Sequence, residues 1–394
     1  MRAHSALDRR AESVTPFHFE PCTLPEEAET LRCEVRAFLQ ETSTNWTPLQ
    51  RTQSWDGFDP DFSRRIAQRG WIGMTWPKCY GGRERSTFER YVVLEEMLFA
   101  GAPVSLHWIA ERQSGPLLLR FGTEQQRLDI LPRIARGETC FCIGLSEPDA
   151  GSDVANIRTR ARQVSNGWRV TGSKLWTTNA HRAHYMIGLF RTAGEPADRH
   201  AGLSQFLVDL SLPGIIVRPI RDLTGGEHFN EVIFDDALLP EEALIGRSGE
   251  GWAQAMAELA FERSGPERFL SSIQVLVELI RSLGTEASEE AAALVGRLTA
   301  QLVTLRKMSL SIAGMLEAKC DPALEAAVVK DLGGSFEQSL PEAVQALLGV
   351  ELGSDGSDLQ KVMTHLTRMA PAFSLRGGTR EILRSIIARG LGLR

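Results

Sequence analysis

The sequence lacks the features that mark several large classes of protein. No apolar run approaches the ~18 residues that a membrane-spanning helix needs. The 44 lysines and arginines are outnumbered by 50 acidic residues, which leaves a formal net charge of -6. A nucleic-acid-binding protein usually carries a basic excess or a basic stripe instead. We therefore expect no membrane span and no nucleic-acid partner.

Cysteines are few and are not spaced for a metal or redox site. The chain has 394 residues and six cysteines, and Cys140 and Cys142 form C-x-C within an apolar run rather than C-x-x-C. The N-terminal stretch MRAHSALDRRAESVTPF has charges but no apolar core, unlike a secretory signal. We therefore expect Cys140 and Cys142 to be packed in the core of a protein from a reducing compartment, and we expect a cytoplasmic location.

Several common catalytic motifs are also missing. We find no G-x-x-x-x-G-K-[ST], no G-x-G-x-x-G after a predicted strand, no G-x-S-x-G and no H-E-x-x-H. His181 and His184 lie in NAHRAH, a spacing that does not favour a metal site. We expect no P-loop, no dinucleotide fold of the Rossmann type and no metal.

Hydrophobic periodicity divides the chain into helical, strand-rich and helical regions. We expect an N-terminal helical domain at 20–139, a middle β domain at 140–237 and a C-terminal helical domain at 238–394. The middle region has short β-rich runs without long helices between them, which favours a small antiparallel barrel or sandwich. The fold class is therefore α+β.

Two helix predictions in the first region rest on particular residues. In 25–41, Leu31, Val35, Phe38 and Leu39 fall on one helical face. In 122–138, Thr123 precedes Gln126 by three residues, the spacing of a capping box.

The stretch CIGLSEPDAGSDVANIRTRA, residues 142–161, carries the most chemical information. It predicts a strand, then a turn of small and hydroxyl residues, then a second strand. Such a loop can approach a flat or anionic ligand, but it can equally be a long hairpin connection. The stretch SKLWTTNA, residues 173–180, adds an aromatic surface and two hydroxyls after a strand.

Together these stretches resemble the acyl-CoA dehydrogenase family. CIGLSEPDAGSDVANI is similar to the family's signature, and KLWTTNA is similar to its second flavin-contact segment. The resemblance extends through FGTEQQRLDILPRIARGE, GGEHFNEVIFDDALLPEEALIGRSGEGWAQAM and GGTREILRSIIARGLGL, and so covers most of the chain. It implies a helical domain, a middle antiparallel β-barrel-like domain and a C-terminal four-helix bundle.

The resemblance implies a flavoprotein oxidoreductase of fatty acid metabolism that binds FAD. Its base would remove the α-proton of an acyl-CoA thioester, and the flavin would take the β-hydride. The residues implied in FAD binding are Ile143, Leu145, Ser146, Gly151, Ser152, Trp176, Thr177, Thr178, Thr379 and Glu381. Substrate contacts are implied for Ser152 and Arg263.

The chain departs from the family at the usual position of the catalytic base. In SLRGGTREIL the matching residue is Gly377, which has no side chain to accept a proton but whose N–H can polarise the thioester carbonyl. Another branch of the family places the base before an arginine on the first long helix of the C-terminal domain. Glu262 in LAFER matches that position, so we expect Glu262 to be the base, with a helical charge paired to Arg263 as the alternative.

The residues after Glu262 predict a break in this helix. Pro266 would leave the Glu262 carbonyl without its helical N–H partner, and Gly265 loosens the same turn. Glu267 is expected to be a solvated helix charge. The opened turn would widen the acyl site or simply kink the helix.

Segments that reach the adenine end of FAD in typical members are missing here. RSLGTEASEEAAALVGRL lacks the family's Arg-x-x-Phe-Gly stretch, and LLGVELGSDGSDLQKV lacks its Tyr-containing loop. Three possibilities follow: an acyl-CoA dehydrogenase that uses Glu262, a non-catalytic or partner subunit of such a complex, or a flavin and CoA-thioester enzyme with other chemistry. The expected partners are an acyl-CoA, an electron-transfer flavoprotein or similar acceptor, and other subunits in a homodimer, homotetramer or hetero-oligomer.

Overall fold

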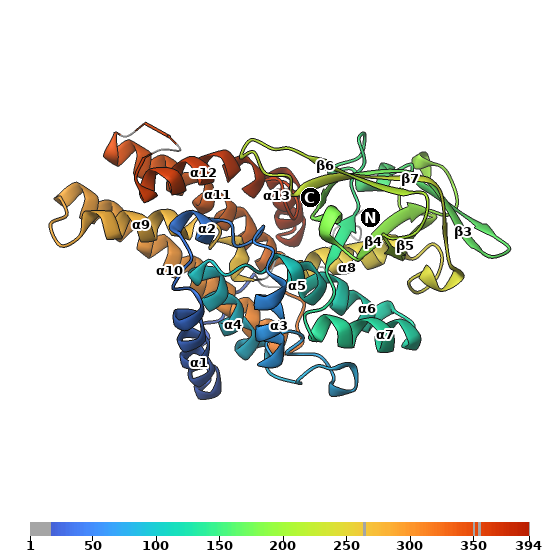
Figure 1. The fold of residues 1–394 in the computed structure, drawn as a ribbon, viewed down its shortest axis with the longest axis horizontal. Helices are drawn as coiled ribbons and strands as arrows, with labels where there is room; N and C mark the ends of the chain where they lie inside the picture. Colours follow the sequence, from blue (N-terminus) through green and yellow to red (C-terminus); the bar gives the residue numbers. More distant parts are fainter. Residues whose placement is uncertain (1–16, 263–264, 350, 354–355, 394) are drawn as a thin grey trace, which may run out of the picture.

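Helices, strands and helices follow one another along the chain, as the sequence predicted (Figure 1). The computed structural model describes residues 17–262, 265–349, 351–353 and 356–393, and it leaves the side chains of 259–262 undescribed. The sheet occupies one end of the elongated molecule, and α9, α10 and α12 extend toward the other end (Figure 1). Among the described residues, no helix is long and apolar enough to cross a membrane.

The first region is a layer of helices with short turns between them. The α-helices are α1 (Glu26–Thr42), α2 (Pro48–Thr52), α3 (Pro60–Gln68), α4 (Thr87–Ala100), α5 (Ser105–Ile109), α6 (Gly115–Phe121) and α7 (Glu124–Ala135). The predicted face of α1 is buried at Leu31, Val35, Phe38 and Leu39, and Thr123 forms the predicted capping box at the start of α7. Both local predictions are therefore confirmed.

A π-helical turn, η2 (Ala110–Ser114), joins α5 to α6. Such turns are rare and are frequently found at functional sites. This one contacts β1 and α8, and all five of its residues are buried. A 3₁₀ turn, η1 (Lys78–Tyr80), lies between α3 and α4.

The middle region is one curled seven-stranded sheet. Its strands are β1 (Phe141–Gly144), β2 (Arg160–Val164), β3 (Gly167–Thr178), β4 (Tyr185–Arg191), β5 (Leu203–Asp209), β6 (Ile215–Ile220) and β7 (Phe229–Leu239). The strand order is β1-β4-β2-β3-β7-β6, with β5 paired to β4. Most pairs are antiparallel as predicted, but β1 pairs with β4 in parallel, and β2 meets β4 in parallel at Arg160 and Arg191.

The third region contains the longest helices. They are α8 (Gly251–Glu262), α9 (Ile273–Leu283), α10 (Glu289–Glu317), α11 (Ala323–Leu348), α12 (Asp358–Phe373) and α13 (Arg380–Gly390). Helix α11 contacts α9, α10, α12 and α13, so it is the central helix of this domain. Short 3₁₀ turns outside the helices are η3 (Val154–Asn156), η4 (Ala180–Arg182), η5 (Pro196–Asp198), η6 (Glu241–Ala243) and η7 (Pro266–Arg268).

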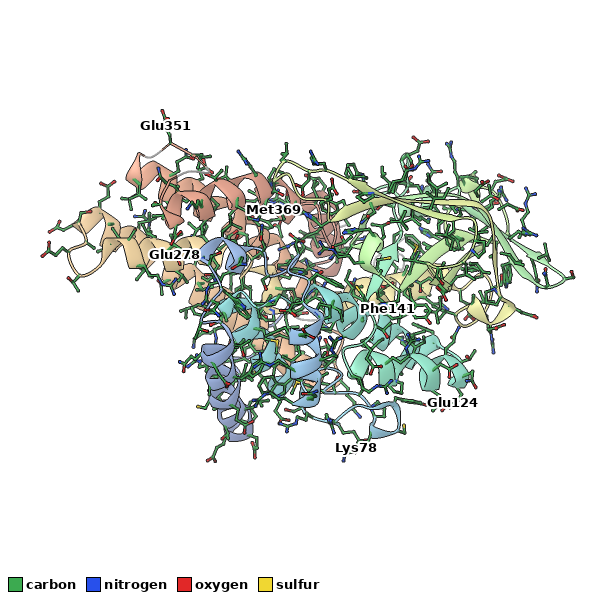
Figure 2. The ribbon with its side chains drawn as sticks, viewed as in Figure 1. Lys78, Glu124, Phe141, Glu278, Glu351 and Met369 are labelled. Carbon is green, nitrogen blue, oxygen red and sulfur yellow. The ribbon has the colours of Figure 1, made fainter. Side chains whose placement is uncertain are left out.

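The largest hydrophobic cluster contains residues of all three regions, and the sheet has a second cluster of its own. Phe141, at the start of β1, is fully buried in a cluster that includes Trp108 of α5 and Phe269 after η7. Figure 2 shows Phe141 where the sheet meets the N-terminal helices. This packing anchors the start of β1 in the helical core.

The predicted break after Glu262 is confirmed. Helix α8 is described as far as Glu262, Gly265 is extended, and the 3₁₀ turn η7 begins at Pro266. A proline lacks the N–H that would continue the helical ladder, which accounts for the break before η7.

Candidate functional site

The two motif segments of the middle domain lie directly beside each other. The N–H of Leu175 on β3 donates to the carbonyl of Ser146, which follows β1, at 2.9 Å. Ile143, Leu145 and Ser146 are half-buried along this line. The predicted site residues of 143–146 and 176–178 are thus brought together by a backbone contact between two segments.

A buried ion pair holds the signature loop, residues 145–159 between β1 and β2, in place. Lys174 on β3 is 0% exposed, and its Nζ donates to Glu147 Oε1 at 2.7 Å and to the carbonyl of Leu145 at 3.2 Å. Glu147 also accepts hydrogen bonds from the N–H groups of Arg158, at 2.6 Å, and Thr159, at 3.0 Å. The pair therefore ties the loop to the start of β2 and to β3.

The electrostatics of this pair follow from its burial. Burial lowers the pKa of Lys174 to about 8, with Glu147 acting in the opposite direction. Burial also acts against the charge of Glu147, but Lys174 and the N–H donors outweigh it, so the pKa of Glu147 lies below its ordinary value. Neither residue was predicted as part of the site, because nothing in the local sequence distinguishes a buried Lys–Glu pair from an exposed one.

Trp176 projects from β3 in a strained conformation. Its φ is 60°, a region that non-glycine residues seldom adopt, and the pairing of β3 with β7 is irregular between Lys174 and Thr177. The ring is 57% exposed and contacts Phe229 edge to face at 6.1 Å. A bulge of this kind re-aims a side chain, and here it presents an indole outside the sheet.

The hydroxyl residues after Trp176 differ in their environments. Thr177 is buried, and its Oγ1 has no hydrogen-bond partner among the described residues. Thr178 is half-buried. Asn179 has a φ of 57°, and its Nδ2 donates to Ser105 Oγ of α5 at 2.6 Å, which joins this segment to the N-terminal domain.

The tip of the signature loop is open to solvent. Gly151 and Ser152 are exposed, and a Cβ added at Gly151 would meet no atom within 4 Å. The loop connects β1 to β2, two strands that both lie along β4 and do not pair with each other. The alternative of an ordinary hairpin connection is therefore wrong.

The C-terminal motif forms the turn between α12 and α13. Gly377 and Gly378 have φ values of 68° and 102°, which favour glycine. Thr379 is the N-cap of α13 and accepts from the N–H of Ile382 at 3.5 Å, while Glu381 is exposed in the first turn. These residues belong to the C-terminal domain, where α13 packs on α11, and not to the β1–β3 group.

The predicted base, Glu262, and its neighbour Arg263 lie where the described part of α8 stops. Glu262 is the last residue of α8, and its side chain lies outside the described residues. The whole of Arg263 also lies outside them.

The prediction for Glu267 is wrong. It was expected to be a solvated charge, but it is 1% exposed and forms an ion pair with Arg112 of η2. The error arose because the partner is 155 positions away in the sequence. A buried carboxylate needs such a partner, since isolated burial of a charge is very costly.

Arg112 and Glu267 are part of a larger buried network around Trp55. In the same network, Arg376 forms an ion pair with Glu337 of α11 at 3.1 Å. The N–H of Ser271 donates to the same glutamate at 2.8 Å. The members of this network lie far apart in the sequence, so no local pattern predicted it.

A second polar group borders Trp55. His228 lies 3.0 Å from Asp222 through Nε2 and 3.8 Å from Asp56 through Nδ1. Burial raises the pKa of Asp56, with His228 acting in the opposite direction. His228 precedes Phe229, the ring against Trp176, so this group lies next to the β3 segment.

Two further sequence predictions concern metal binding and the cysteines. Among the described residues, no group of three or more His, Cys, Asp or Glu side chains is arranged to hold a metal. All six cysteines are free, and Cys140 and Cys142 are buried as expected.

Comparison with known proteins places the chain in a family. Residues 25–138, 142–237 and 249–392 match the N-terminal, middle and C-terminal domains of acyl-CoA dehydrogenase. The chain is 34% identical to acyl-CoA dehydrogenase IpdE1 of Mycobacterium tuberculosis over 385 residues, which covers 93% of this chain and 98% of that protein.

Solved structures agree with the sequence relatives. The structure titled Tcur3481-Tcur3483 steroid ACAD superposes with a TM-score of 0.85 at 26% identity, covering 94% of this chain and 99% of that chain. The ChsE4-ChsE5 complex from Mycobacterium tuberculosis gives a TM-score of 0.82 at 25% identity, covering 95% and 100%. The chain therefore belongs to the acyl-CoA dehydrogenase family and is an oxidoreductase of that flavin-dependent family.

Proposed function

We propose that the protein catalyses FAD-dependent α,β-dehydrogenation of an acyl-CoA thioester, with Glu262 as the base. The observation that carries the proposal is the hydrogen bond between Leu175 and Ser146, which joins the two flavin-contact segments of the family into one surface. Acyl-CoA dehydrogenation itself is the activity of the family to which the chain belongs.

The residues of this surface suit a flat, partly polar ligand. Trp176 offers an exposed indole face beside the half-buried Thr178, and the buried Thr177 hydroxyl has no described protein partner. Buried hydroxyls normally have a hydrogen-bond partner, so a ligand at this surface would account for that group. Ile143, Leu145, Ser146, Gly151, Ser152, Trp176, Thr177, Thr178, Thr379 and Glu381 are the proposed FAD contacts.

The chain's own residues would handle the α-proton and the thioester carbonyl. Bound FAD supplies the acceptor for the β-hydride, because no protein side chain can take one. Glu262 would accept the α-proton, and the N–H of Gly377 would donate to the carbonyl oxygen, where negative charge develops. Glu262 lies in α8, the first long helix of the C-terminal domain, where one branch of the family carries its base, and this match supports the first role.

A partner subunit remains a second candidate. The relative titled ChsE4-ChsE5 complex contains two named components, and the present chain lacks the family's usual adenine-side segments. We propose that a second subunit, identical or different, completes the FAD site and that Ser152 and Arg263 contact the substrate. An electron-transfer flavoprotein is the proposed acceptor, and the cytoplasm is the proposed location.

The proposal is tested by the flavin spectrum of the purified protein and its anaerobic bleaching by acyl-CoA thioesters. Glu262→Gln should slow bleaching by about 10²-fold or more, since a positioned base contributes on the order of 10²–10⁴. The matched control is Glu258→Gln, one turn earlier on α8, where Gln205 Nε2 donates to the carboxylate at 3.0 Å. Bleaching of Glu262→Gln at the wild-type rate would remove Glu262 as the base, and a colourless protein that refuses FAD would favour the partner-subunit function.

A further inference from the structure

An asparagine on β7 is hydrogen-bonded to the segment of β3 that carries Trp176. Asn230 is 0% exposed and lies opposite Thr177, where the β3–β7 pairing resumes after its irregular stretch. Its Nδ2 donates to the carbonyl of Thr177 at 2.9 Å and to the carbonyl of His228 at 3.2 Å. The amide therefore holds the residue that directly follows Trp176.

The residues at the start of β7 bind the same segment at two further positions. The N–H of Asn179 donates to the carbonyl of His228 at 2.6 Å. The side-chain Oδ1 of Asn230 lies 3.0 Å from Nδ1 of His181, in the turn η4. Alternate residues of the segment are thus tied to residues 228–230.

The contacts of Asn230 determine which atom of each side chain is the donor. Because one atom of the amide faces two carbonyl oxygens, that atom is the nitrogen, and Oδ1 is left as the acceptor. The hydrogen bond with His181 therefore requires a proton on Nδ1 of the imidazole. Desolvation of the ring and the neighbouring Arg182 lower the pKa of His181, so the neutral ring with its proton on Nδ1 is the form present at neutral pH.

This network lies where the strand ladder gives the least support. Trp176 has a φ of 60°, and a residue in so strained a conformation persists only where its surroundings hold it. A bulge disrupts the ladder locally, so other hydrogen bonds have to fix the residues on each side of it. On one side, the N–H of Leu175 donates to the carbonyl of Ser146 at 2.9 Å. On the other side, the carbonyl of Thr177 accepts from Asn230.

We infer that Asn230 is a positioning residue that holds the indole of Trp176 in place for FAD, and that His181 keeps the Asn230 amide in the required orientation. This inference rests on the proposed function, because it takes Trp176 as an FAD contact. Asn230 acts through the backbone of Thr177 and needs no contact with FAD of its own. Its replacement by an acceptor of the same shape should therefore weaken FAD binding without removing an FAD contact.

Asn230→Asp tests this role at constant side-chain shape. A carboxylate has no hydrogen to donate and a protonated carboxyl has only one, so the carbonyls of Thr177 and His228 would lose at least one of their two hydrogen bonds. We expect the Kd for FAD, measured by titration, to rise at least about tenfold, as for a buried carbonyl left without its donor. An unchanged Kd would overturn the inference.

The matched control is Gln126→Glu, on α7. Gln126 is also buried, and its Nε2 also donates to two backbone carbonyls, those of Glu242 at 2.8 Å and Leu244 at 3.2 Å. These carbonyls follow β7 and do not belong to the segment that carries Trp176. Gln126→Glu should lower the unfolding midpoint but leave the Kd for FAD within about twofold of wild type. Equal losses of FAD affinity in the two variants would overturn the inference.

A double-mutant cycle separates positioning of the indole from general support of the sheet. In the Trp176→Ala background, Asn230→Asp should weaken FAD binding by less than about threefold, because the ring through which Asn230 acts is gone. The same fold loss of affinity with and without the indole would overturn the inference.

Variants of His181 test the orientation of the amide and leave the buried asparagine in place. Asparagine can present an N–H where the imidazole presents its Nδ1 proton, whereas leucine cannot. His181→Asn should therefore keep an FAD affinity close to that of the wild type, and His181→Leu should weaken it at least about threefold. Because His181 is exposed, these variants decide the matter even if Asn230→Asp does not fold. Equal affinities in the two His181 variants would overturn the inference.

Failure of the proposed function gives a different result. If the wild-type protein does not bind FAD, the proposed function fails, and the fluorine NMR signal of Trp176 in protein labelled with fluorotryptophan decides the inference instead. Trp176→Phe assigns this signal by its absence. The signal should shift in Asn230→Asp and stay in place in Gln126→Glu. A Trp176 signal that Asn230→Asp does not move would overturn the inference without reference to FAD.

Discussion

The buried pair of Lys174 and Glu147 should be the largest single polar contribution to the order of the signature loop. Lys174 is 0% exposed, so Lys174→Met removes a cation and leaves the Glu147 carboxylate in a dry environment. Breaking a buried pair by removing one partner costs about 3–5 kcal/mol. Glu147 keeps the N–H donors of Arg158 and Thr159, which places the expected loss at the lower end, about 3 kcal/mol.

The assay is urea unfolding followed by circular dichroism, together with titration of FAD into the variant. We expect a lower unfolding midpoint and weaker FAD binding, since the loop carrying Ser146 would lose its anchor on β3. Glu147→Gln combined with Lys174→Met should recover part of the loss, because the double variant leaves no uncompensated charge.

The control for this experiment lies on the same strand. Arg169 of β3 pairs with Asp236 at 2.8 Å, but both side chains are exposed. Arg169→Met should therefore change the free energy of unfolding by about 0.5 kcal/mol or less. A loss of under about 1 kcal/mol in Lys174→Met, or a loss equal to that of Arg169→Met, would refute the reasoning.

Three further predictions concern other parts of the molecule. Burial lowers the pKa of His107 to about 4. Between pH 4 and the pKa of histidine in the unfolded chain, the unfolded state therefore binds more protons than the folded state. About 3 kcal/mol of the free energy of unfolding should be present at pH 7 and lost as the pH falls toward 4. His107→Gln should flatten that dependence in unfolding measured from pH 4 to 7, and an unchanged slope would contradict the assignment. Trp176→Ala should weaken FAD binding at least about tenfold while the free energy of unfolding stays within about 1 kcal/mol, because the ring is 57% exposed; unchanged FAD affinity would remove Trp176 from the site. Gly333→Ala should destabilise the protein by about 1–3 kcal/mol, because the added Cβ would lie 2.1 Å from the Arg268 carbonyl, and normal thermal stability would show that α11 can shift.

The sequence was most informative where structure depends on near neighbours. The buried face of α1 follows from the spacing of Leu31, Val35 and Phe38, and the capping box follows from Thr123 and Gln126, three positions apart. The end of α8 follows from the chemistry of Pro266 alone. Each of these predictions needed no more than about two helical turns of context.

Long-range pairings could not be read in the same way. The sequence around Glu267 does not distinguish it from an exposed helical glutamate, and its burial depends on the ion pair with Arg112. In the same way, the burial of Lys174 depends on its ion pair with Glu147. The parallel pairing of β1 with β4 also depends on the whole sheet and not on local alternation of residues. The family resemblance named the site segments, but the hydrogen bond from Leu175 to Ser146 that joins them is known only from the fold.

The network around Trp55 also has a consequence for how the protein can change over time. Its ion pairs connect η2 with η7 and α11 with the α12–α13 turn, so each charge depends on a residue encoded far away. A single substitution there would strand a charge before its partner could change. Substitutions in this network should therefore occur in pairs, such as Arg112 together with Glu267, and such pairs should co-vary among descendants of this chain. The guanidinium groups of Arg112, Arg268 and Arg376 all lie within 6.0 Å of the Trp55 ring centroid, so Trp55 is the position that should tolerate the least drift.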